Sequence, residues 1–553
     1  MSELPPVDPR ARWTYLGLAA FVVVMWFATL PLRPLFNPDE GRYAEIPREM
    51  LASGEWIIPH LNGLAYIEKP PLQYWATALA MRVFGHDEFA ARFYTALCAF
   101  GTLVMVWLAA RRPQSSAAAW QAAAVLASML LFLVLGQLLT LDMSLTFYLT
   151  SSLVGFLMAQ PVPGEAVSRR TERRWILLAW VAAALGVLTK GLVAAAIPAA
   201  VLVLYSFYSG DFLPWRRLHI ARGLPLFLVI TVPWHWVAAH RLPDFVQFFF
   251  VHEHVSRYLT PSAHREAAWW YFAAVFMAGS IPWTLSALRV VSVGWRRALP
   301  GQFDRALFLW LWIVFIGVFF SLSDSKLAPY ILPAMPALAL LIAASPAAAW
   351  RRDLLFTAIF TVLVALGLAA ASLYGPRFMP ATDRNQYFAM LAAPLAEIAA
   401  LLAISGMFVL LQRRRDPTHS AVFLGVGWCL AGLLLMRAAG LVAPVYSGVV
   451  LARAVSAVPP AEPLYSVGTF DQTLPFYWQR TFKLVAYRGE LDFGLRHDAG
   501  AEIPSVAQFV EEWRGVPDGY AVMETNMFND LKNSGVPMRE VARDVHRVLV
   551  ARR

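Results

Sequence analysis

Long apolar runs recur along this chain of 553 residues and limit what it can fold into. A helix that crosses a lipid bilayer needs about 20 consecutive, mostly apolar residues. Hydrophobic residues make up 59% of the chain and charged residues 15%, whereas soluble domains average about 45–50% and about 25%. This excess excludes a water-soluble or disordered chain and predicts a polytopic α-helical membrane protein. We find thirteen candidate spans, at about 12–32, 89–110, 117–137, 143–159, 175–189, 191–208, 223–240, 268–290, 306–322, 327–345, 354–374, 391–412 and 420–440.

Clusters of arginine predict how these spans are oriented. The net charge of +10 does not indicate binding to nucleic acid, because the basic residues form short clusters between the apolar runs. Every second loop is basic, and the positive-inside rule places such loops in the cytoplasm. We therefore expect a cytoplasmic N-terminus and a first span that acts as a signal anchor. The clusters are Arg10 and Arg12; Arg111 and Arg112; Arg169, Arg170, Arg173 and Arg174; Arg216, Arg217 and Arg222; Arg296 and Arg297; Arg351 and Arg352; and Arg413, Arg414 and Arg415.

The first loop on the external side, at about 33–88, is too long for a simple connector. It contains helix-like stretches near 40–52 and 71–84. The second stretch is apolar but only about 14 residues long, which is too short to span a bilayer. We expect it to be an interfacial or re-entrant helix.

The composition changes near residue 445, which divides the chain into two expected domains. The apolar runs shorten to strand length and alternate with helical patterns, as in an α/β fold. We therefore expect a transmembrane domain at 1–444 and a small external α/β domain at 445–553. The expected strands are Leu464–Val467, Phe482–Tyr487 and Tyr520–Met523, and the expected helices are 505–514 and 526–534.

Ionisable residues near membrane depth are costly and mark functional sites, and here they gather on the external side. Only five of the 46 basic residues are Lys, and three of these stand at external turns of the membrane part: Lys69, Lys190 and Lys326. Because Lys binds phosphate as a compact point charge, the pattern favours a phosphate-containing substrate. The other candidates are Asp39, Arg42, Tyr43, Tyr66, Glu68, Asp142, His252, Glu253, His254 and Tyr330.

Each candidate also has an ordinary structural explanation. Asp39 follows Pro38 and would cap an interfacial helix, and Asp142 would be a polar residue of a tight hairpin. Glu68 and Lys69 would form a surface ion pair of little energy, and the lysines would snorkel to the interface. Glu68, His252 and His254 offer the O and N ligands of a zinc site, although most loop histidines are simply solvated.

No Walker A loop, Rossmann glycine fingerprint or HExxH motif is present, which disfavours a nucleotide substrate. Other segments do match a known pattern: Pro38–Ile46, Tyr66–Trp75, Asp142, Ser325–Leu327 and Tyr330–Pro333. Through these segments the chain resembles the bacterial aminoarabinose transferase family, which is related to protein O-mannosyltransferases among membrane glycosyltransferases of GT-C type. The resemblance runs over the whole chain.

The resemblance implies an inverting transfer of 4-amino-4-deoxy-L-arabinose from undecaprenyl phosphate to lipid A phosphates. It also implies location in the bacterial inner membrane, resistance to polymyxin and no required cofactor. It makes Asp39 and Asp142 the catalytic carboxylates. We expect the external α/β domain to cover the active-site cavity and to orient the lipid A acceptor. Because the leaving phosphate gathers negative charge, we expect Arg42, Lys69, Lys190 and Lys326 to stabilise it, with Tyr43, Tyr66 and Tyr330 in the substrate site.

Two other functions remain open from the sequence. The first keeps the fold and transfers the sugar to a protein hydroxyl. The second is a lipid transporter or flippase. A transporter is disfavoured by the lack of repeated halves, by charges that lie at one face rather than the midplane, and by the external α/β domain.

Overall fold

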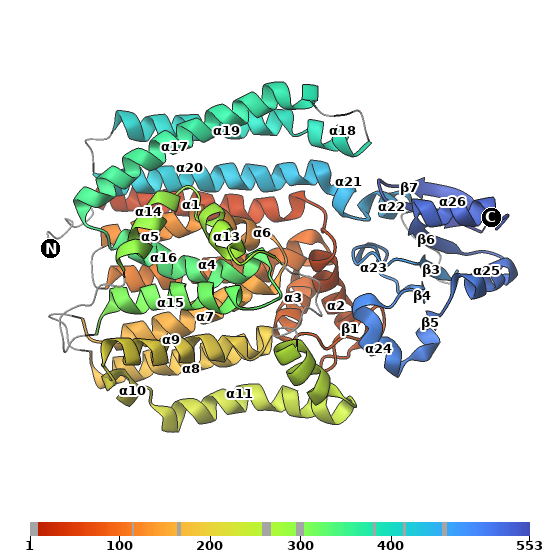
Figure 1. Ribbon diagram of the computed structural model, residues 1–553, viewed down its shortest axis with the longest axis horizontal. Coiled ribbons are helices and arrows are strands. Elements are labelled where there is room, and N and C mark those ends of the chain that lie inside the picture. Colours follow the sequence, from red (N-terminus) through yellow and green to blue (C-terminus); the bar gives the residue numbers. More distant parts are fainter. Residues whose placement is uncertain are drawn as a thin grey trace.

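A long bundle of helices carries a small sheet domain at one end (Figure 1). The computed structural model describes residues 9–112, 116–162, 167–256, 267–294, 303–378, 380, 383–412, 416–455 and 462–552. We call the end of the bundle next to the sheet domain the sheet-domain end. The first described helix, α1 (Pro9–Thr29), begins at the opposite end (Figure 1).

Each of the thirteen predicted spans is occupied by a helix or by a broken pair of helices. Within the described ranges, seven helices are long and apolar enough to cross a membrane, or eight if the bent pair α5–α6 is one span. The seven are α1 (Pro9–Thr29), α4 (Glu88–Arg111), α7 (Leu141–Ala159), α11 (Ile220–Arg241), α17 (Ala347–Tyr374), α19 (Ala392–Leu411) and α20 (Pro417–Ala438). The other bundle segments are α5 (Ser116–Ser128), α6 (Leu130–Gln137), α8 (Arg169–Lys190), α9 (Val193–Ser209), α13 (Tyr271–Gly279), α14 (Thr284–Val293), α15 (Arg305–Ser321), η4 (Ala328–Ala334) and α16 (Met335–Ala343).

Three predicted spans are not the continuous helices that their sequences suggest. The span at 117–137 breaks at Met129, whose backbone is extended, and α5 and α6 meet at 66°. The span at 268–290 breaks between α13 and α14, where Pro282 stands. The span at 327–345 begins as the 3-10 helix η4. Continuous apolar sequence therefore concealed these breaks.

Local sequence explains where the helices begin and end. Aspartate or serine caps several first turns, and the carboxylate of Asp87 accepts a hydrogen bond from Ala90 N at 2.8 Å. Such caps satisfy backbone donors that have no partner in the helix. The predicted turn at Lys190-Gly191 is confirmed, since α8 ends at Lys190 and Gly191 has φ of 87°. Glycine adopts this conformation without strain.

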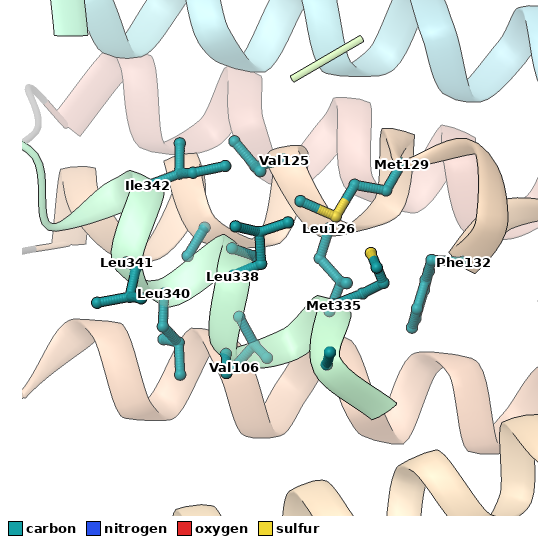
Figure 2. Packing of buried hydrophobic residues seen from close by; sticks show 14 of the residues in the cluster. Val106, Val125, Leu126, Met129, Phe132, Met335, Leu338, Leu340, Leu341 and Ile342 are labelled. Carbon is teal, nitrogen blue, oxygen red and sulfur yellow. The ribbon is translucent and has the colours of Figure 1, made fainter. Parts of the chain in front are cut away.

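Close packing joins the helices of the bundle. In lipid, helix association depends on van der Waals contact rather than on a hydrophobic driving force, and small residues let backbones approach. A Cβ on Gly425 of α20 would lie 2.8 Å from the carbonyl of Ala124 on α5. Figure 2 shows the centre of the bundle, where Leu338 and Ile342 of α16 pack beside Val125 of α5.

The predicted first loop contains the two expected helices, α2 (Asp39–Ser53) and α3 (Leu72–Phe84), joined by the short hairpin β1–β2 (His60–Leu61 and Leu64–Ala65). It follows the short helix η1 (Leu30–Leu32). Both helices lie at the sheet-domain end (Figure 1). After α11, the π-helical segment η2 (Gln247–Ser256) also lies near this loop, because its Glu253 contacts Lys69.

The sheet domain has six strands in the order β5-β4-β3-β6-β8-β7. The first four are parallel to one another, and β8 runs antiparallel to β6 and β7. The strands are β3 (Leu464–Val467), β4 (Lys483–Val485), β5 (Glu502–Ile503), β6 (Tyr520–Glu524), β7 (Arg539–Arg543) and β8 (Arg547–Ala551). The helices are α23 (Leu474–Trp478), α24 (Asp492–His497), α25 (Val506–Gly515) and α26 (Thr525–Asn533). The α/β character predicted from the sequence is therefore confirmed.

The connection from the bundle to the sheet domain consists of the short helices η6 (Ala439–Val442), α21 (Ala443–Tyr446) and α22 (Val449–Ala454), which follow α20. Two other short helices, η5 (Gly375–Phe378) and α18 (Asp383–Ala389), join α17 to α19. Helices α2 and α23 contact each other across this boundary. The sheet domain therefore rests directly on the first loop.

Candidate active site

The candidate site is built around α2, a polar helix that is almost entirely buried. Residues 40–50 are all buried, although five of these eleven residues are charged. Buried charges need partners, so each of these side chains must be held by a neighbour. Asp39 is the exception, since 52% of its side chain is exposed.

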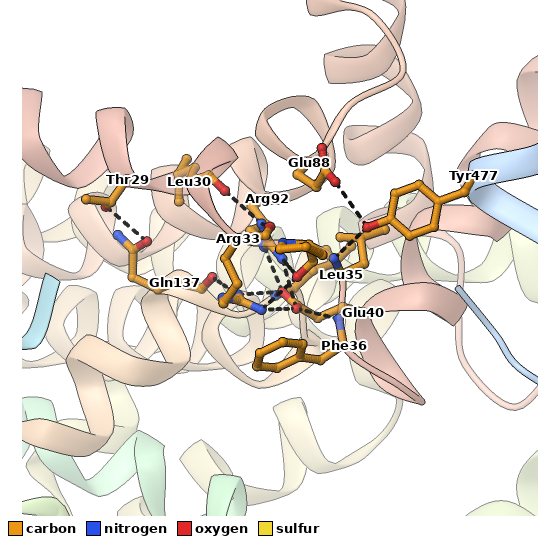
Figure 3. Close-up of polar contacts among 12 residues, drawn as sticks. Thr29, Leu30, Arg33, Leu35, Phe36, Glu40, Glu88, Arg92, Gln137 and Tyr477 are labelled. Atoms are coloured by element: carbon orange, nitrogen blue, oxygen red, sulfur yellow. Dashed lines mark hydrogen bonds and ion pairs between the residues drawn. The ribbon is translucent and has the colours of Figure 1, made fainter. Parts of the chain in front are cut away.

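Glu40 anchors the first turn of α2 to the bundle (Figure 3). Its carboxylate accepts hydrogen bonds from Arg33 at 2.5 and 3.0 Å, and from Arg92 of α4 at 2.8 and 3.0 Å. Backbone N–H groups of Phe36 and Leu139 add two more. Burial by itself would raise the pKa of Glu40, but the two guanidinium groups outweigh it and hold the pKa well below its ordinary value.

Because Glu40 is fixed, its neighbour Asp39 presents an open carboxylate at a defined place. The nearest cation is Arg42, whose Nη1 lies 3.8 Å from Asp39 Oδ1. This separation is too long for a hydrogen bond. Asp39 therefore remains available to a substrate, and its catalytic role stays a prediction.

Arg42 is held by a residue of the sheet domain. Its Nη2 lies 2.7 Å from Glu490 Oε2, and its Nη1 donates to the hydroxyl of Tyr66 at 3.1 Å. The rings of Tyr43 and Tyr66 lie 5.7 and 5.9 Å from the guanidinium carbon, within cation–π range. Burial raises the pKa of Glu490, although Arg42 lowers it.

A cavity of about 600 Å³ opens beside this ion pair, between η2 and the sheet domain. Glu490 lines one side, and Glu68, His252 and Glu253 line the other. Lys69 stands at this place too, because its Nζ donates to Glu253 Oε2 and to the carbonyl of Glu68, both at 2.8 Å. Five carboxylates and the guanidinium of Arg496 line the cavity. Glu490, Glu253 and Asp492 are paired with Arg42, Lys69 and Arg496, and the remaining excess of negative charge favours a ligand with a cationic group.

Asp142 and Lys190 form a second charged pair. Asp142 stands in the first turn of α7 and Lys190 at the last residue of α8, and Lys190 Nζ lies 2.5 Å from Asp142 Oδ1. The ring of Tyr330 lies 5.0 Å from the same ammonium group. Lys326, four residues earlier, donates to the carbonyl of Ser323 in its own turn at 2.7 Å.

The three residues predicted as a metal site share a neighbourhood only in part. Two of them, Glu68 and His252, line the same cavity. Glu253, the carboxylate next to His252, is paired with Lys69. The side chain of His254 lies outside the described residues. Within the described part of the chain, no group of three His, Cys, Asp or Glu side chains is placed to hold a metal ion.

Residues of the sheet domain complete the site, and the sequence did not reveal them. Glu490 pairs with Arg42, and Gln472 donates to Glu490 at 2.7 Å. Tyr477 donates to Glu88 at 3.0 Å and accepts from the backbone N–H of Leu35 at 2.8 Å (Figure 3). These residues follow no catalytic motif, and their partners lie far away along the chain.

Two solved structures of ArnT from Cupriavidus metallidurans are similar to the whole chain. The one bound to undecaprenyl phosphate has a TM-score of 0.90 and 33% identity, and the match covers 98% of each chain. The structure in the apo state has a TM-score of 0.89 and 32% identity over 99% of each chain.

Family models and curated relatives match parts of the chain. Residues 11–249 match the model of dolichyl-phosphate-mannose-protein mannosyltransferase, and residues 451–552 match that of the aminoarabinose transferase C-terminal domain. An undecaprenyl phosphate-alpha-4-amino-4-deoxy-L-arabinose arabinosyl transferase of Aeromonas salmonicida is 35% identical over 343 residues, 60% of this chain and 60% of the relative. One of Sodalis glossinidius is 36% identical over 61% of this chain and 59% of the relative. The chain thus spans about 60% of the length of the curated relatives that it matches.

A helical bundle with a charged first loop and an appended sheet domain defines a multi-span membrane protein of GT-C type. The similarity to the ArnT structures over the whole chain identifies one family within this class. The chain belongs to the bacterial aminoarabinose transferase family, as its sequence motifs predicted.

Proposed function

We propose that the protein transfers 4-amino-4-deoxy-L-arabinose from undecaprenyl phosphate to phosphate groups of lipid A. The observation that carries this proposal is the similarity over 98% of the chain to an ArnT structure that is bound to undecaprenyl phosphate. The names of the curated relatives agree with it. The charges at the sheet-domain end supply the groups that such a reaction needs.

In the proposed step, an oxygen of the lipid A phosphate attacks the anomeric carbon from the face opposite the leaving group. The new C1–O bond forms as the bond to undecaprenyl phosphate breaks, and the departing phosphate keeps the electron pair. Cations near that phosphate stabilise the transition state more than the ground state. The candidates for this role are Lys69, Lys190, Lys326 and Arg42.

The acceptor needs little help from a general base. The second pKa of a phosphate monoester is about 6, so the nucleophilic oxygen is largely ionised at neutral pH. We therefore assign Asp39 to positioning the sugar or stabilising positive charge at C1. Glu68 and Glu490, which line the cavity, would contact the ammonium group of the sugar, and Asp142, beside Lys190, is a further candidate for this contact.

The step as written requires no cofactor, since it relies on the protein's own cations to stabilise the leaving phosphate. A zinc ion held by Glu68, His252 and His254 would instead organise the loop around Lys69. Transfer by protein treated with a chelator and then dialysed tests this assignment. Retained activity supports a reaction without metal, and activity that zinc restores contradicts it.

We further propose that the protein lies in the bacterial inner membrane with a cytoplasmic N-terminus and a periplasmic sheet domain. The arginines in Arg111–Arg112, Arg169–Arg174 and Arg216–Arg217 stand on elements that begin or end away from the sheet domain (Figure 1). This separation follows the positive-inside rule.

Mass spectrometry of lipid A from cells with and without the protein tests the function. A mass increase equal to added aminoarabinose, together with increased polymyxin resistance, is the expected result. Unchanged lipid A in cells that supply the donor would overturn the proposal.

A second candidate is transfer of a polyprenyl-phosphate-linked sugar to protein hydroxyl groups. The match of residues 11–249 to a protein mannosyltransferase model favours it. The same comparison of cells distinguishes the two, because this activity leaves lipid A unchanged and adds sugar to a protein.

A further inference from the structure

The loop that precedes α23 joins the sheet domain to the start of α2. The side chain of Asn37 donates to Asp471 Oδ2 at 2.5 Å, and its carbonyl oxygen accepts from the backbone N–H of Gln472 at 3.0 Å. The two segments touch so closely that a Cβ on Gly41 would lie 2.5 Å from the carbonyl carbon of Gln472. The backbone of Gln472 is therefore in direct contact with the helix that bears Asp39.

This loop is rigid for a clear reason. Asp471 Oδ1 accepts three hydrogen bonds, from Thr473 N at 2.8 Å, Thr473 Oγ1 at 2.6 Å and Leu474 N at 3.1 Å. Its other oxygen also forms an ion pair with Arg547 of β8. A group mounted on such a loop keeps a fixed position relative to α2.

The side chain of Gln472 reaches from this junction into the site. Its amide Nε2 donates to Glu490 Oε1 at 2.7 Å, while Glu490 Oε2 lies 2.7 Å from Arg42 Nη2. Gln472 is 7% exposed, and the Glu490 side chain is 13% exposed. Each carboxylate oxygen thus has its own donor, which fixes the rotation of the carboxylate as well as its place.

Glu490 needs this support because opposing charges surround it. Arg42 attracts it, whereas the carboxylates of Asp39 on α2 and Glu68 in the following loop repel it. Without the amide, the carboxylate is free to turn toward Arg42 with both oxygens and away from the cavity. A hydrogen bond to a charged, buried acceptor is among the stronger ones in proteins.

We propose that Gln472 is a positioning residue of the transfer reaction, which holds the carboxylate of Glu490 at the angle required by Arg42 and the bound sugar. The inference rests on the proposed function and extends it to a residue of the sheet domain that acts only through Glu490. The sheet domain is then part of the active site as well as its cover.

The test is steady-state transfer to lipid A by the full-length protein in detergent or liposomes. Gln472→Ala is expected to lower kcat by roughly ten- to a hundredfold, the loss of one hydrogen bond to a charged group. The KM for the lipid-linked donor should change little, since the cationic residues are untouched. Gln508→Ala, in an exposed glutamine of α25, is the matched control and should keep wild-type kinetics.

A double-mutant cycle separates positioning from a general structural effect. If Gln472 acts through Glu490, then Gln472→Ala causes no further loss of kcat in the Glu490→Ala background. Equal losses in both backgrounds would overturn the proposal. So would wild-type kcat in the single variant.

Gln472→Glu provides a signature that folding defects do not produce. Two facing carboxylates repel when both are ionised but share a proton when one is neutral. Its kcat should therefore recover as the pH falls, in contrast to the wild-type enzyme, and a pH profile parallel to the wild type would contradict the proposal. Wild-type protein that transfers no aminoarabinose to lipid A would refute the proposed function instead, so the two failures are distinguishable.

Discussion

At the scale of residues, Asp39 and Glu40 show how two adjacent carboxylates take opposite roles. Glu40 is surrounded by donors, whereas Asp39 is open to solvent. Glu40 fixes the start of the helix, and the neighbouring Asp39 is left open to a substrate. Their different environments, rather than their residue type, decide which of them can take part in the chemistry.

Replacing Asp39 tests this assignment. Asp39→Asn keeps the shape of the side chain but removes its charge, so we expect transfer to fall by on the order of 10²–10³-fold. The rate of aminoarabinose transfer to lipid A is the measurement. Asp518→Asn, at an exposed aspartate of the sheet domain, should transfer at the wild-type rate, and full activity of Asp39→Asn would exclude an essential role.

Glu40→Gln should destabilise the protein without entering the chemistry directly. It leaves Arg33 and Arg92 buried as like charges, and breaking a buried ion pair costs about 3–5 kcal/mol. Thermal unfolding in detergent measures the loss. Glu540→Gln removes a half-exposed partner of Arg543 and should cost about 0–1 kcal/mol; similar losses in the two variants would contradict the assigned role of the buried cluster.

The raised pKa of Glu490 predicts an acidic limb in the rate profile. Burial raises this pKa above 4.5, although Arg42 and the hydrogen bond from Gln472 lower it. The rate of transfer should fall as the pH drops through the raised pKa of Glu490, because protonation of Glu490 breaks its ion pair with Arg42. In Gln472→Ala one lowering contact is lost, so the limb should move to higher pH. The free energy of unfolding depends on pH in the opposite direction. The raised pKa of Glu490 stabilises the folded protein at low pH, and this contribution is lost as the pH rises through the pKa of Glu490 in the folded protein.

At the scale of elements, the sequence predicted α2, α3 and β3 closely because their patterns are local. The strand predicted at Leu464–Val467 is β3, with the same bounds. The break at Met129 was missed because Leu130 N donates to the carbonyl of Ile281, which lies far along the chain. The same distinction applies to the residues of the site. Asp39 and Arg42 belong to one local motif and could be predicted, whereas Gln472 contacts Asn37, which lies 435 residues away along the chain.

The contact between α2 and the loop before α23 makes a prediction about one glycine. Gly41→Ala places a methyl group 2.5 Å from the carbonyl carbon of Gln472. Alanine favours a helix over glycine by about 1 kcal/mol, but overpacking against rigid backbone costs about 1–3 kcal/mol. We expect the clash to prevail, with faster proteolysis of the sheet domain and reduced transfer.

Gly367→Ala in α17 is the control, because nothing lies within 4 Å of its added Cβ. It gains the helix propensity of alanine without a clash and should be neutral or slightly stabilising. Equal proteolysis of the two variants would show that the close approach at Gly41 does not hold the domains together.

At the scale of the whole molecule, charge and fold divide the protein between two ends. The arginine clusters at 111–112, 169–174 and 216–217 stand on helices that begin or end away from the sheet domain, whereas the pairs Lys69–Glu253 and Lys190–Asp142 stand toward that domain (Figure 1). The sequence predicted this division because topology requires a charge bias in the loops. It did not predict that the sheet domain supplies Glu490, because no local pattern marks a residue whose partner belongs to another domain.

This division predicts which thiols a membrane-impermeant reagent can reach. The two native cysteines, Cys98 and Cys429, are 2% and 1% exposed, so each introduced cysteine reports on its own position. Gln508→Cys, on the sheet domain, should be labelled in cells whose outer membrane alone has been permeabilised. Ser116→Cys, at the exposed start of α5, should be labelled only after the inner membrane is opened, because the proposed orientation places the nearby Arg111–Arg112 cluster in the cytoplasm. Labelling in the reverse pattern would place the carboxylates and lysines on the cytoplasmic side, away from a periplasmic lipid A acceptor, and would contradict the proposed orientation.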